Sequence, residues 1–322
     1  MEKPVILISA ICGDIGYSAV RALCKAARKI VGCDMKPYSP VPHHVDKFYA
    51  APAATNTTNY MAFLKEIIIR EKVGFFLPVS EPEIEVLNTR RKDIEALGVQ
   101  VLLNKQNIID TFLDKLKTVQ YLESLNIEIP KTTLLSNYDG SYGYPVIVKS
   151  RKSYGSKELR KIIDLHDLEY VRKKDDGSLL IQECVGSDKE EYTTGVFSDG
   201  NIVSSITFRR KLGFGSLSIE AFLADEPFLD DLAQRIAKDT GLIGSINIQS
   251  RRVGDVFILF EINPRLSSTL LFRKKFGFDD AVWWLNVLLG KGYSYKRKFK
   301  SGRAVRCLSE CYFDMEKIED DN

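Results

Sequence analysis

Hydrophobic and polar residues follow two different patterns along the first hundred positions. Short runs of consecutive apolar residues predict strands that are buried on both faces. These runs occupy residues 5–8, 30–33, 75–79 and 99–103. Between the runs, apolar residues recur every three or four positions, which predicts helices such as 60–71 and 81–97. This order is typical of a parallel sheet covered by helices, so we expect a Rossmann-like α/β domain over residues 1–105.

A different pattern begins after residue 105. Two helical segments in 107–126 lead to strands that are joined by short turns. The tetrad Ser198-Asp199-Gly200-Asn201 is a hairpin signal between two of these strands. The second domain therefore has an α+β pattern, and we predict that it spans residues 106–315. The acidic end, residues 316–322, is expected to be a frayed tail.

Composition and charge narrow the classes of function. Hydrophobic residues make up 44% of the 322 positions and charged residues 28%, which is typical of a globular protein. The 46 Lys and Arg residues against 43 Asp and Glu give a net charge of +3, too small a basic excess for a dedicated nucleic-acid binder. The best apolar run, 282–289, is much shorter than the roughly 20 residues that span a bilayer. We therefore expect small-molecule partners, and neither nucleic acid nor membrane.

The cysteines, histidines and glycines argue against disulfide bonds, a zinc site and a dinucleotide-binding site. None of the six cysteines forms a C-x-x-C pair, which favours reduced thiols and a cytoplasmic location. Only three histidines are present, so a zinc site lacks ligands. The segment from Gly13 to Gly16 follows the first predicted strand, but it is G-x-x-G and not G-x-G-x-x-G. A nicotinamide cofactor is therefore disfavoured.

Four oxygen-bearing side chains are predicted to converge on one hairpin. The strands on either side of the turn at Gly254-Asp255 carry Asn247 and Gln249 before the turn and Glu261 and Asn263 after it. Alternation along each strand places the two members of each pair on one face. Magnesium takes oxygen ligands, with one or two carboxylates from the protein and others from phosphates and water. In this segment taken alone, an exposed polar face is the alternative interpretation.

Basic residues occur in segments that could meet phosphate. Lys149 ends a predicted strand and precedes residues 150–157, a loop of small residues whose backbone N–H groups could surround phosphate oxygens. Lys115 lies in a helical pattern after Asp114. Arg210 belongs to a basic triplet that follows a predicted strand, where it could meet an anionic substrate. Each of these residues taken singly is also consistent with a solvated surface charge, so the argument rests on their order.

That order resembles the ATP-grasp superfamily, in particular the short, single-module relatives of the carbamoyl-phosphate synthase large subunit. The most specific motif is Glu261-Ile262-Asn263-Pro264-Arg265. The resemblance implies a Rossmann-like pre-ATP-grasp domain followed by a two-lobed ATP-grasp domain, with lobe A at about 106–182 and lobe B at about 183–315. It also implies an ATP-dependent ligase that uses magnesium, or manganese in its place, and joins a carboxylate to an amine or related nucleophile through an acyl phosphate. The ordered residues are Lys115, Lys149, Glu183, Glu191, Gln249, Glu261 and Asn263.

The resemblance further implies where a nucleotide would lie. Its phosphates would be held by Lys115 and Lys149, and its ribose hydroxyls would be bound by Glu191. Its adenine would border the linker between the two lobes. The linker residues are Gln182, Glu183, Cys184 and Val185. The loop residues that would cover the phosphates are Ser153, Gly155 and Ser156.

The same resemblance implies the metal and catalytic residues. Magnesium would bind Gln249, Glu261 and Asn263. Arg265 would lie near the transferring phosphate and would act as a catalytic group together with Arg210 and Lys149. Phosphoryl transfer needs positioning and charge neutralisation more than covalent chemistry.

Two departures from the family pattern keep a second function open. The phosphate loop has a single glycine, Gly155, and Gln249 stands where many relatives have an acid. A non-catalytic ATP-binding module with a sensing or scaffolding role is therefore the alternative to a ligase. The apolar residues 282–289 also leave room for a homodimer.

Overall fold

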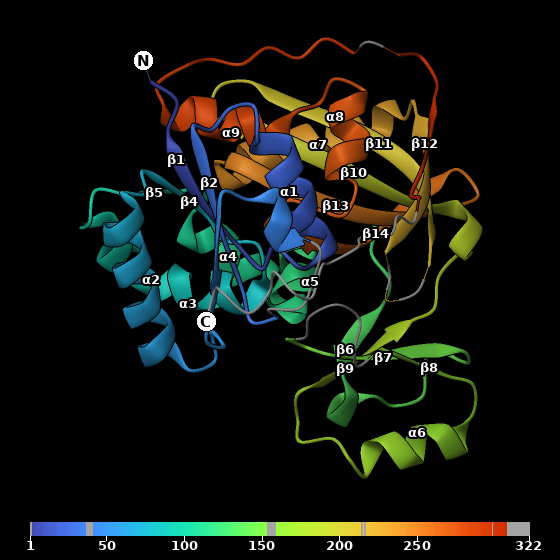
Figure 1. Ribbon diagram of the computed structural model, residues 1–322. Helices are drawn as coiled ribbons and strands as arrows, with labels where there is room; N and C mark the ends of the chain where they lie inside the picture. The colour runs from blue at the N-terminus through green and yellow to red at the C-terminus, as the bar shows by residue number, and fades with distance from the viewer. Residues whose placement is uncertain are drawn as a thin grey trace.

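The computed structural model describes residues 2–36, 41–152, 159–213, 215, 217–297 and 299–307. Within these residues the strands form three sheets, which we call the N-terminal sheet, the small sheet and the large sheet. In Figure 1 the small sheet, which contains β6 to β9, projects from the body that the other two sheets form. Among the described residues, none of the helices is both long enough and apolar enough to cross a membrane.

The N-terminal sheet is parallel and has the strand order β3-β2-β1-β4-β5. Ile6 and Ile8 of β1 belong to a core cluster with α1, whereas Leu7 between them belongs to a second cluster with α2 and α3. Burial on both faces explains the continuous apolar run, and the predicted Rossmann-like layer is confirmed. The elements are β1 Val5–Ser9, α1 Asp14–Leu23, β2 Lys29–Asp34, η1 Val41–His44, β3 Lys47–Ala50, α2 Thr57–Glu71, β4 Phe75–Leu77, α3 Glu81–Glu95 and β5 Gln100–Val101.

Strand β3 is not predicted by the sequence pattern. It lies at the edge of the N-terminal sheet, and its residues are half-buried or exposed. An edge strand that keeps contact with water carries no continuous apolar run, so the pattern that reveals β1 and β2 does not reveal β3.

Two short helices connect the N-terminal sheet to the small sheet. They are α4 Gln106–Phe112 and α5 Lys115–Ser124, where two helical segments are predicted. Asp114 is the N-cap of α5 and accepts from the backbone N–H of Leu116 at 3.0 Å. The same carboxylate forms an ion pair of 2.7 Å with Arg151, which follows a strand of the small sheet. Asp114 therefore fixes the start of α5 against the small sheet.

The small sheet is antiparallel and has the order β6-β9-β7-β8, with α6 against one face. Val146 and Val148 of β7 pack against Leu168 and Val171 of α6, which gives this sheet a core of its own. The elements are β6 Thr132–Leu134, η2 Leu135–Asn137, β7 Val146–Ser150, β8 Arg160–Ile162, α6 Leu165–Arg172 and β9 Leu179–Glu183.

The large sheet is antiparallel and has the order β14-β13-β10-β11-β12-β15. Gly200 in the β10–β11 turn has φ of 97°, which glycine adopts readily. Helix α7 packs on one face of the sheet, and α8 and α9 join its other face to α1 of the N-terminal domain. The elements are η3 Asp188–Glu190, β10 Glu191–Asp199, β11 Val203–Leu212, β12 Ser218–Ala224, α7 Pro227–Thr240, β13 Ile243–Val253, β14 Val256–Asn263, α8 Leu270–Lys275, α9 Asp280–Leu288 and β15 Arg303–Val305.

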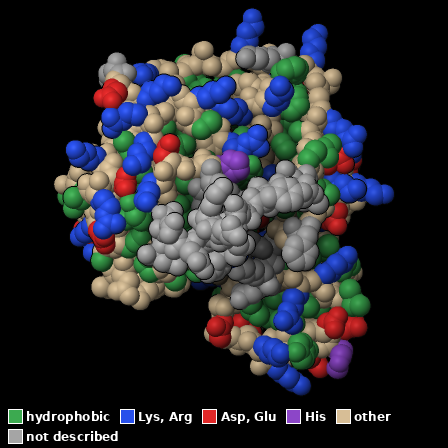
Figure 2. All heavy atoms as spheres, in the orientation of Figure 1, with side chains coloured by type: hydrophobic (Ala, Val, Ile, Leu, Met, Phe, Trp, Pro, Cys, Tyr) green, Lys and Arg blue, Asp and Glu red, His purple; other side chains and the backbone are tan. Residues whose placement is uncertain are grey.

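One prediction about the large sheet is wrong. The basic triplet that contains Arg210 does not follow a strand, because β11 continues to Leu212. Alternation along β11 therefore governs the triplet: Arg210 is buried, whereas Arg209 has 42% of its side chain exposed. Charge is mixed over the face of the molecule in Figure 2, where Lys and Arg side chains are scattered and Asp and Glu lie among them.

Candidate active site

A cavity of about 660 Å³ lies where the three sheets meet. The small sheet contributes Lys149, the large sheet contributes Glu191 and Glu261, and the N-terminal domain contributes Asp14 and Glu81 from the first turns of α1 and α3. The cavity therefore receives charged side chains from every part of the fold.

The β13–β14 hairpin brings four oxygen-bearing side chains to this cavity. Asn247 is opposite Asn263, and Gln249 is opposite Glu261, in the strand register. The amide oxygens already accept hydrogen bonds: Asn247 from Thr193 at 2.9 Å, and Asn263 from Arg265 at 3.3 Å. Gln249 accepts from Arg210 at 2.9 Å. Glu261 is the one carboxylate of the four, so it carries their negative charge.

This donor set suits magnesium bound together with a nucleotide. Among the described residues there is no group of three or more His, Cys, Asp or Glu side chains that could hold a metal ion by themselves. Magnesium usually keeps waters and takes one or two protein carboxylates plus phosphate oxygens, which one glutamate among amides can satisfy. An amide oxygen has two acceptor positions, so Gln249 could bind a cation while it accepts from Arg210.

Lys149 on β7 is a buried ammonium group with a neutral partner. Its side chain donates to Gln182 Oε1 at 2.9 Å, and Gln182 Nε2 donates in turn to Thr132 at 2.8 Å. Burial lowers the pKa of Lys149 to about 8, with a smaller lowering by Lys115, while Glu261 acts in the opposite direction. Lys149 is therefore still mostly protonated at neutral pH, and its buried charge favours an incoming anion.

The linker predicted between the two lobes borders the same cavity. Gln182 and Glu183 end β9, and Cys184 and Val185 follow them along the wall of the cavity. The backbone N–H of Glu183 donates to the carbonyl of Lys131 at 2.9 Å, so this amide is already engaged. The linker thus contributes a backbone edge to the cavity, whereas the side chain of Gln182 is directed at Lys149.

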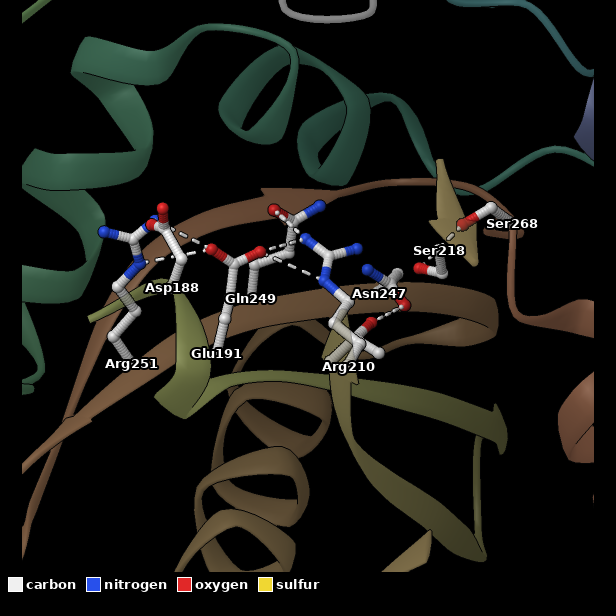
Figure 3. A network of polar contacts seen from close by, with 9 residues as sticks. Asp188, Glu191, Arg210, Ser218, Asn247, Gln249, Arg251 and Ser268 are labelled. Atoms are coloured by element: carbon white, nitrogen blue, oxygen red, sulfur yellow. Dashed lines mark hydrogen bonds and ion pairs between the residues drawn. The ribbon is translucent and has the colours of Figure 1, made fainter. Parts of the chain in front are cut away.

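Glu191 and Arg265 both have strong partners in the structure. Glu191 is 3% exposed and lies between Arg210 and Arg251, as Figure 3 shows. Arg265 forms an ion pair of 2.5 Å with Glu81 at the start of α3, and both side chains are largely buried. Each residue therefore joins separate parts of the cavity wall.

The structure brings most of the predicted site residues to one cavity. The residues that line it are Lys115, Lys149, Gln182, Glu183, Cys184, Val185, Glu191, Arg210, Gln249, Glu261, Asn263 and Arg265. The predicted loop residues Ser153, Gly155 and Ser156 lie outside the described residues, so their placement stays a prediction.

Sequence reasoning missed Asp14, Glu81 and Arg251, which also line the cavity. Asp14 and Glu81 follow the carboxyl ends of β1 and β4, the edge of a parallel sheet at which ligands bind in open α/β folds. That rule could have identified the two acids. Arg251 gives no comparable signal, because an arginine two positions beyond Gln249 is an ordinary residue on a strand.

Two family models match separate parts of the chain. Residues 6–102 match the model described as "PylC-like, N-terminal domain". Residues 177–311 match the model described as "ATP-grasp in the biosynthetic pathway with Ter operon". The first match covers the N-terminal sheet, and the second covers the large sheet with its metal-binding candidates.

Curated relatives and solved structures are similar at low identity. The carbamoyl phosphate synthase large chain of Campylobacter jejuni is 24% identical over 205 residues, which are 57% of this chain and 19% of that one. The formate-dependent phosphoribosylglycinamide formyltransferase of Thioalkalivibrio sulfidiphilus is 24% identical over 295 residues, 82% of this chain and 70% of that one. The match thus spans about a fifth of the first relative's length.

Among solved structures, the N5-carboxyaminoimidazole synthetase from Staphylococcus aureus complexed with ADP gives a TM-score of 0.75 at 16% identity, covering 96% of this chain and 84% of that chain. The biotin carboxylase domain of the Hydrogenobacter thermophilus 2-oxoglutarate carboxylase, in complex with MgADP, gives a TM-score of 0.74 at 14% identity, covering 92% and 72%. At these identities the likeness establishes the fold.

Proposed function

Because the chain belongs to the ATP-grasp superfamily, we propose that it is an ATP- and magnesium-dependent ligase that joins a carboxylate to an amine or a related nucleophile. One observation carries the proposal: a single cavity holds the buried ammonium of Lys149, the carboxylate of Glu261 with three amide groups around it, and Arg265. The phosphates of a nucleoside triphosphate require both a positively charged side chain and a metal site with oxygen ligands. The solved structures with ADP and MgADP support this assignment for the fold.

In the proposed reaction, a carboxylate oxygen attacks the γ-phosphorus of ATP, and the bond to ADP breaks to give an acyl phosphate. The amine then attacks the acyl carbon, inorganic phosphate leaves, and the amine loses a proton. Magnesium held by Glu261, Asn263 and Gln249, or manganese in its place, would neutralise phosphate charge. Lys149, Lys115 and Arg265 would do so from the protein side, since such transfer depends on positioning and charge neutralisation.

The nucleotide is proposed to lie along the cavity from the linker to the hairpin. Its adenine would border the backbone of residues 183–185, and its phosphates would reach Lys149 and Glu261. The loop at 153–156 would cover the phosphates, because an acyl phosphate must be kept from water. The substrates would bind on the side of Asp14 and Glu81, where the N-terminal domain lines the cavity.

Replacing Glu261 with alanine tests the metal site. We expect Glu261→Ala to lose the magnesium-dependent part of ADP binding, at least about 100-fold, because even indirect partners of metal ligands are worth 10 to 100-fold. Calorimetric titration of ADP with and without Mg²⁺ measures this, and circular dichroism checks the fold. Asp255→Asn is the matched control, since Asp255 lies in the turn of the same hairpin and its side chain is fully exposed.

Two results would contradict the proposal. Unchanged magnesium-dependent ADP binding in Glu261→Ala would refute the metal assignment. Normal nucleotide binding by the native protein, without phosphate release for any pair of carboxylate and amine in a screen, would favour the non-catalytic ATP-binding module instead. The observation that favours this second candidate is the neutral Gln249 in the metal-binding set, which leaves Glu261 as the one carboxylate of the four side chains.

A further inference from the structure

A buried carboxylate joins two arginines across the wall of the cavity (Figure 3). Arg210 donates to Oε1 of Glu191 through Nε at 3.1 Å and through Nη2 at 2.8 Å. Arg251 donates to Oε2 of Glu191 through Nε at 3.1 Å and Nη2 at 2.9 Å. We call this set of three residues the arginine bridge. Only 4% of the Glu191 side chain is exposed, so the shared carboxylate is shielded from water.

The arginine bridge occupies the hydrogen-bonding capacity of Glu191. An ionised carboxylate offers about four acceptor positions, and the two guanidinium groups supply four donors. A ribose hydroxyl could bind Glu191 only by displacing one of these charge-assisted bonds, which are stronger than the bond that a neutral hydroxyl would form. The geometry is therefore unfavourable for the role that the family resemblance implies for Glu191.

Each arginine of the bridge also contacts a part of the proposed nucleotide site. Arg210 Nη2 donates to Gln249 Oε1 at 2.9 Å, at the magnesium end of the cavity. Arg251 Nη1 donates to the carbonyl of Val185 at 3.2 Å, in the linker at the adenine end. A continuous line of polar contacts therefore runs from the linker through Glu191 to the metal-binding hairpin.

The three residues of the arginine bridge lie on adjacent strands of the large sheet. Strand β10, which carries Glu191, lies between β13 and β11, which carry Arg251 and Arg210. Glu191 is directly paired with Arg251 in the β10–β13 register. Side chains on adjacent strands of one sheet keep their separation better than side chains on loops. The bridge can therefore hold two distant contacts at a fixed spacing.

We propose that Glu191 is a positioning residue, which holds Arg210 against Gln249 and Arg251 against the linker carbonyl of Val185. The inference rests on the proposed function and deepens it, because it assigns a residue that fixes the linker relative to the magnesium end. It also means that the preference for ribose over deoxyribose, where the protein shows one, comes from groups other than Glu191.

The first test compares nucleotides that differ only in their ribose hydroxyls. Arg251 also pairs with the exposed Asp188 at 2.5 Å, so Glu191 is the carboxylate that the two arginines share. Glu191→Gln keeps the size of the side chain but removes this shared charge. We expect it to weaken Mg²⁺-dependent binding of ADP, 2′-deoxy-ADP and 3′-deoxy-ADP by the same factor, at least about tenfold, as for other buried charge pairs that lose one partner. Glu190→Gln is the matched control, because the side chain of Glu190 is 40% exposed and pairs with Arg209 at 3.5 Å outside the cavity. Calorimetry measures all three nucleotides.

A second test distinguishes the two ends of the bridge by how Mg²⁺ affects ADP binding in a variant at each end. Arg251→Gln should weaken ADP binding by the same factor with and without Mg²⁺, because Arg251 contacts the linker. Arg210→Gln should reduce the factor by which Mg²⁺ strengthens ADP binding, because Arg210 contacts Gln249. Glu191→Gln should show both effects. Arg251 is 21% exposed, so Arg251→Gln carries the test if Glu191→Gln does not fold.

The results that overturn the inference differ from those that overturn the proposed function. A native protein that binds no ADP would refute the proposed function, and the positioning role with it. A native protein that binds ADP, with a Glu191→Gln variant that loses affinity for ADP but not for the deoxynucleotides, would show that Glu191 reads the ribose and would overturn the inference alone. Arginine variants with native binding and native magnesium dependence would overturn it as well.

Discussion

Replacing Lys149 with methionine is expected to stabilise the protein at neutral pH while it weakens nucleotide binding. Lys149 on β7 is 7% exposed, and its ammonium group donates to the neutral Gln182. Methionine has a similar length and no charge to bury. A residue kept for phosphate binding at a cost in stability is a common feature of functional sites.

The magnitude follows from the pKa of Lys149, which burial lowers from an ordinary value of 10.5 to about 8. That difference corresponds to about 3 kcal/mol of unfavourable free energy in the folded state at pH 7. Losing the hydrogen bond to Gln182 costs about 1 kcal/mol in return. The net prediction is that Lys149→Met raises the free energy of unfolding by about 2 kcal/mol at pH 7.

The dependence on pH has a definite sign. Because the pKa of Lys149 is lower in the folded state, both states hold the proton below pH 8, and the burial cost is then fully present. Between pH 8 and 10.5 the unfolded state binds more protons, so this group makes the native protein more stable as pH rises. The cost that Lys149→Met relieves is therefore about 3 kcal/mol at pH 7, about 2 at pH 9 and about 1 at pH 10.

Urea unfolding at pH 7, 9 and 10, followed by circular dichroism, measures the difference between Lys149→Met and the native protein. Lys117→Met replaces an exposed lysine of α5 and should change the free energy of unfolding by less than about 0.5 kcal/mol at pH 7. A variant that is less stable than the native protein at pH 7 would refute the reasoning. So would a stability difference that stays constant from pH 7 to pH 10.

Two further predictions concern contacts between the N-terminal domain and the large sheet. Asn104 is fully buried and donates to the carbonyls of Ser245 at 2.8 Å and Pro264 at 2.9 Å, so Asn104→Leu should lower the free energy of unfolding by about 2 to 4 kcal/mol in urea titrations. A change below 1 kcal/mol would contradict this account. Glu81→Gln should release the guanidinium of Arg265 and tighten calorimetric binding of inorganic phosphate several-fold, whereas unchanged or weaker binding would show that Glu81 does not compete with anions.

The sequence predicts the fold wherever a local pattern is sufficient. Alternate residues of β1 enter two different core clusters, so a continuous apolar run reports a strand covered on both faces. Helix α7 ends at Thr240, and the next residue, Gly241, has φ of 61°, a conformation that glycine adopts readily at the end of a helix. Strand β3 could not be found this way, because its half-exposed residues lack an apolar run and its place at the edge depends on pairing with β2.

The sequence also predicts part of the candidate site, but not all of its contacts. Alternation along the strands is enough to place Gln249 with Asn247 and Glu261 with Asn263, and the register then brings the two pairs together. The arginine bridge was beyond this reasoning, because Arg251 contacts a residue 60 positions away. The sequence pattern predicts that Arg210 follows a strand, where it would be free to meet an anion. The continuation of β11 instead turns it toward Glu191.

These contacts give an order to the events that phosphate binding would require. Arg210 and Arg265 are both held by carboxylates, Glu191 and Glu81, and an anion must compete with those carboxylates to reach them. Lys149 donates instead to the neutral Gln182, and its charge is buried, so a phosphate gains most by binding there first. Arg265 could then exchange Glu81 for the transferring phosphate, because this ion pair joins the N-terminal domain to the hairpin. The arginine bridge, by contrast, is built within one sheet, so an exchange of partners at Arg265 leaves its contacts intact.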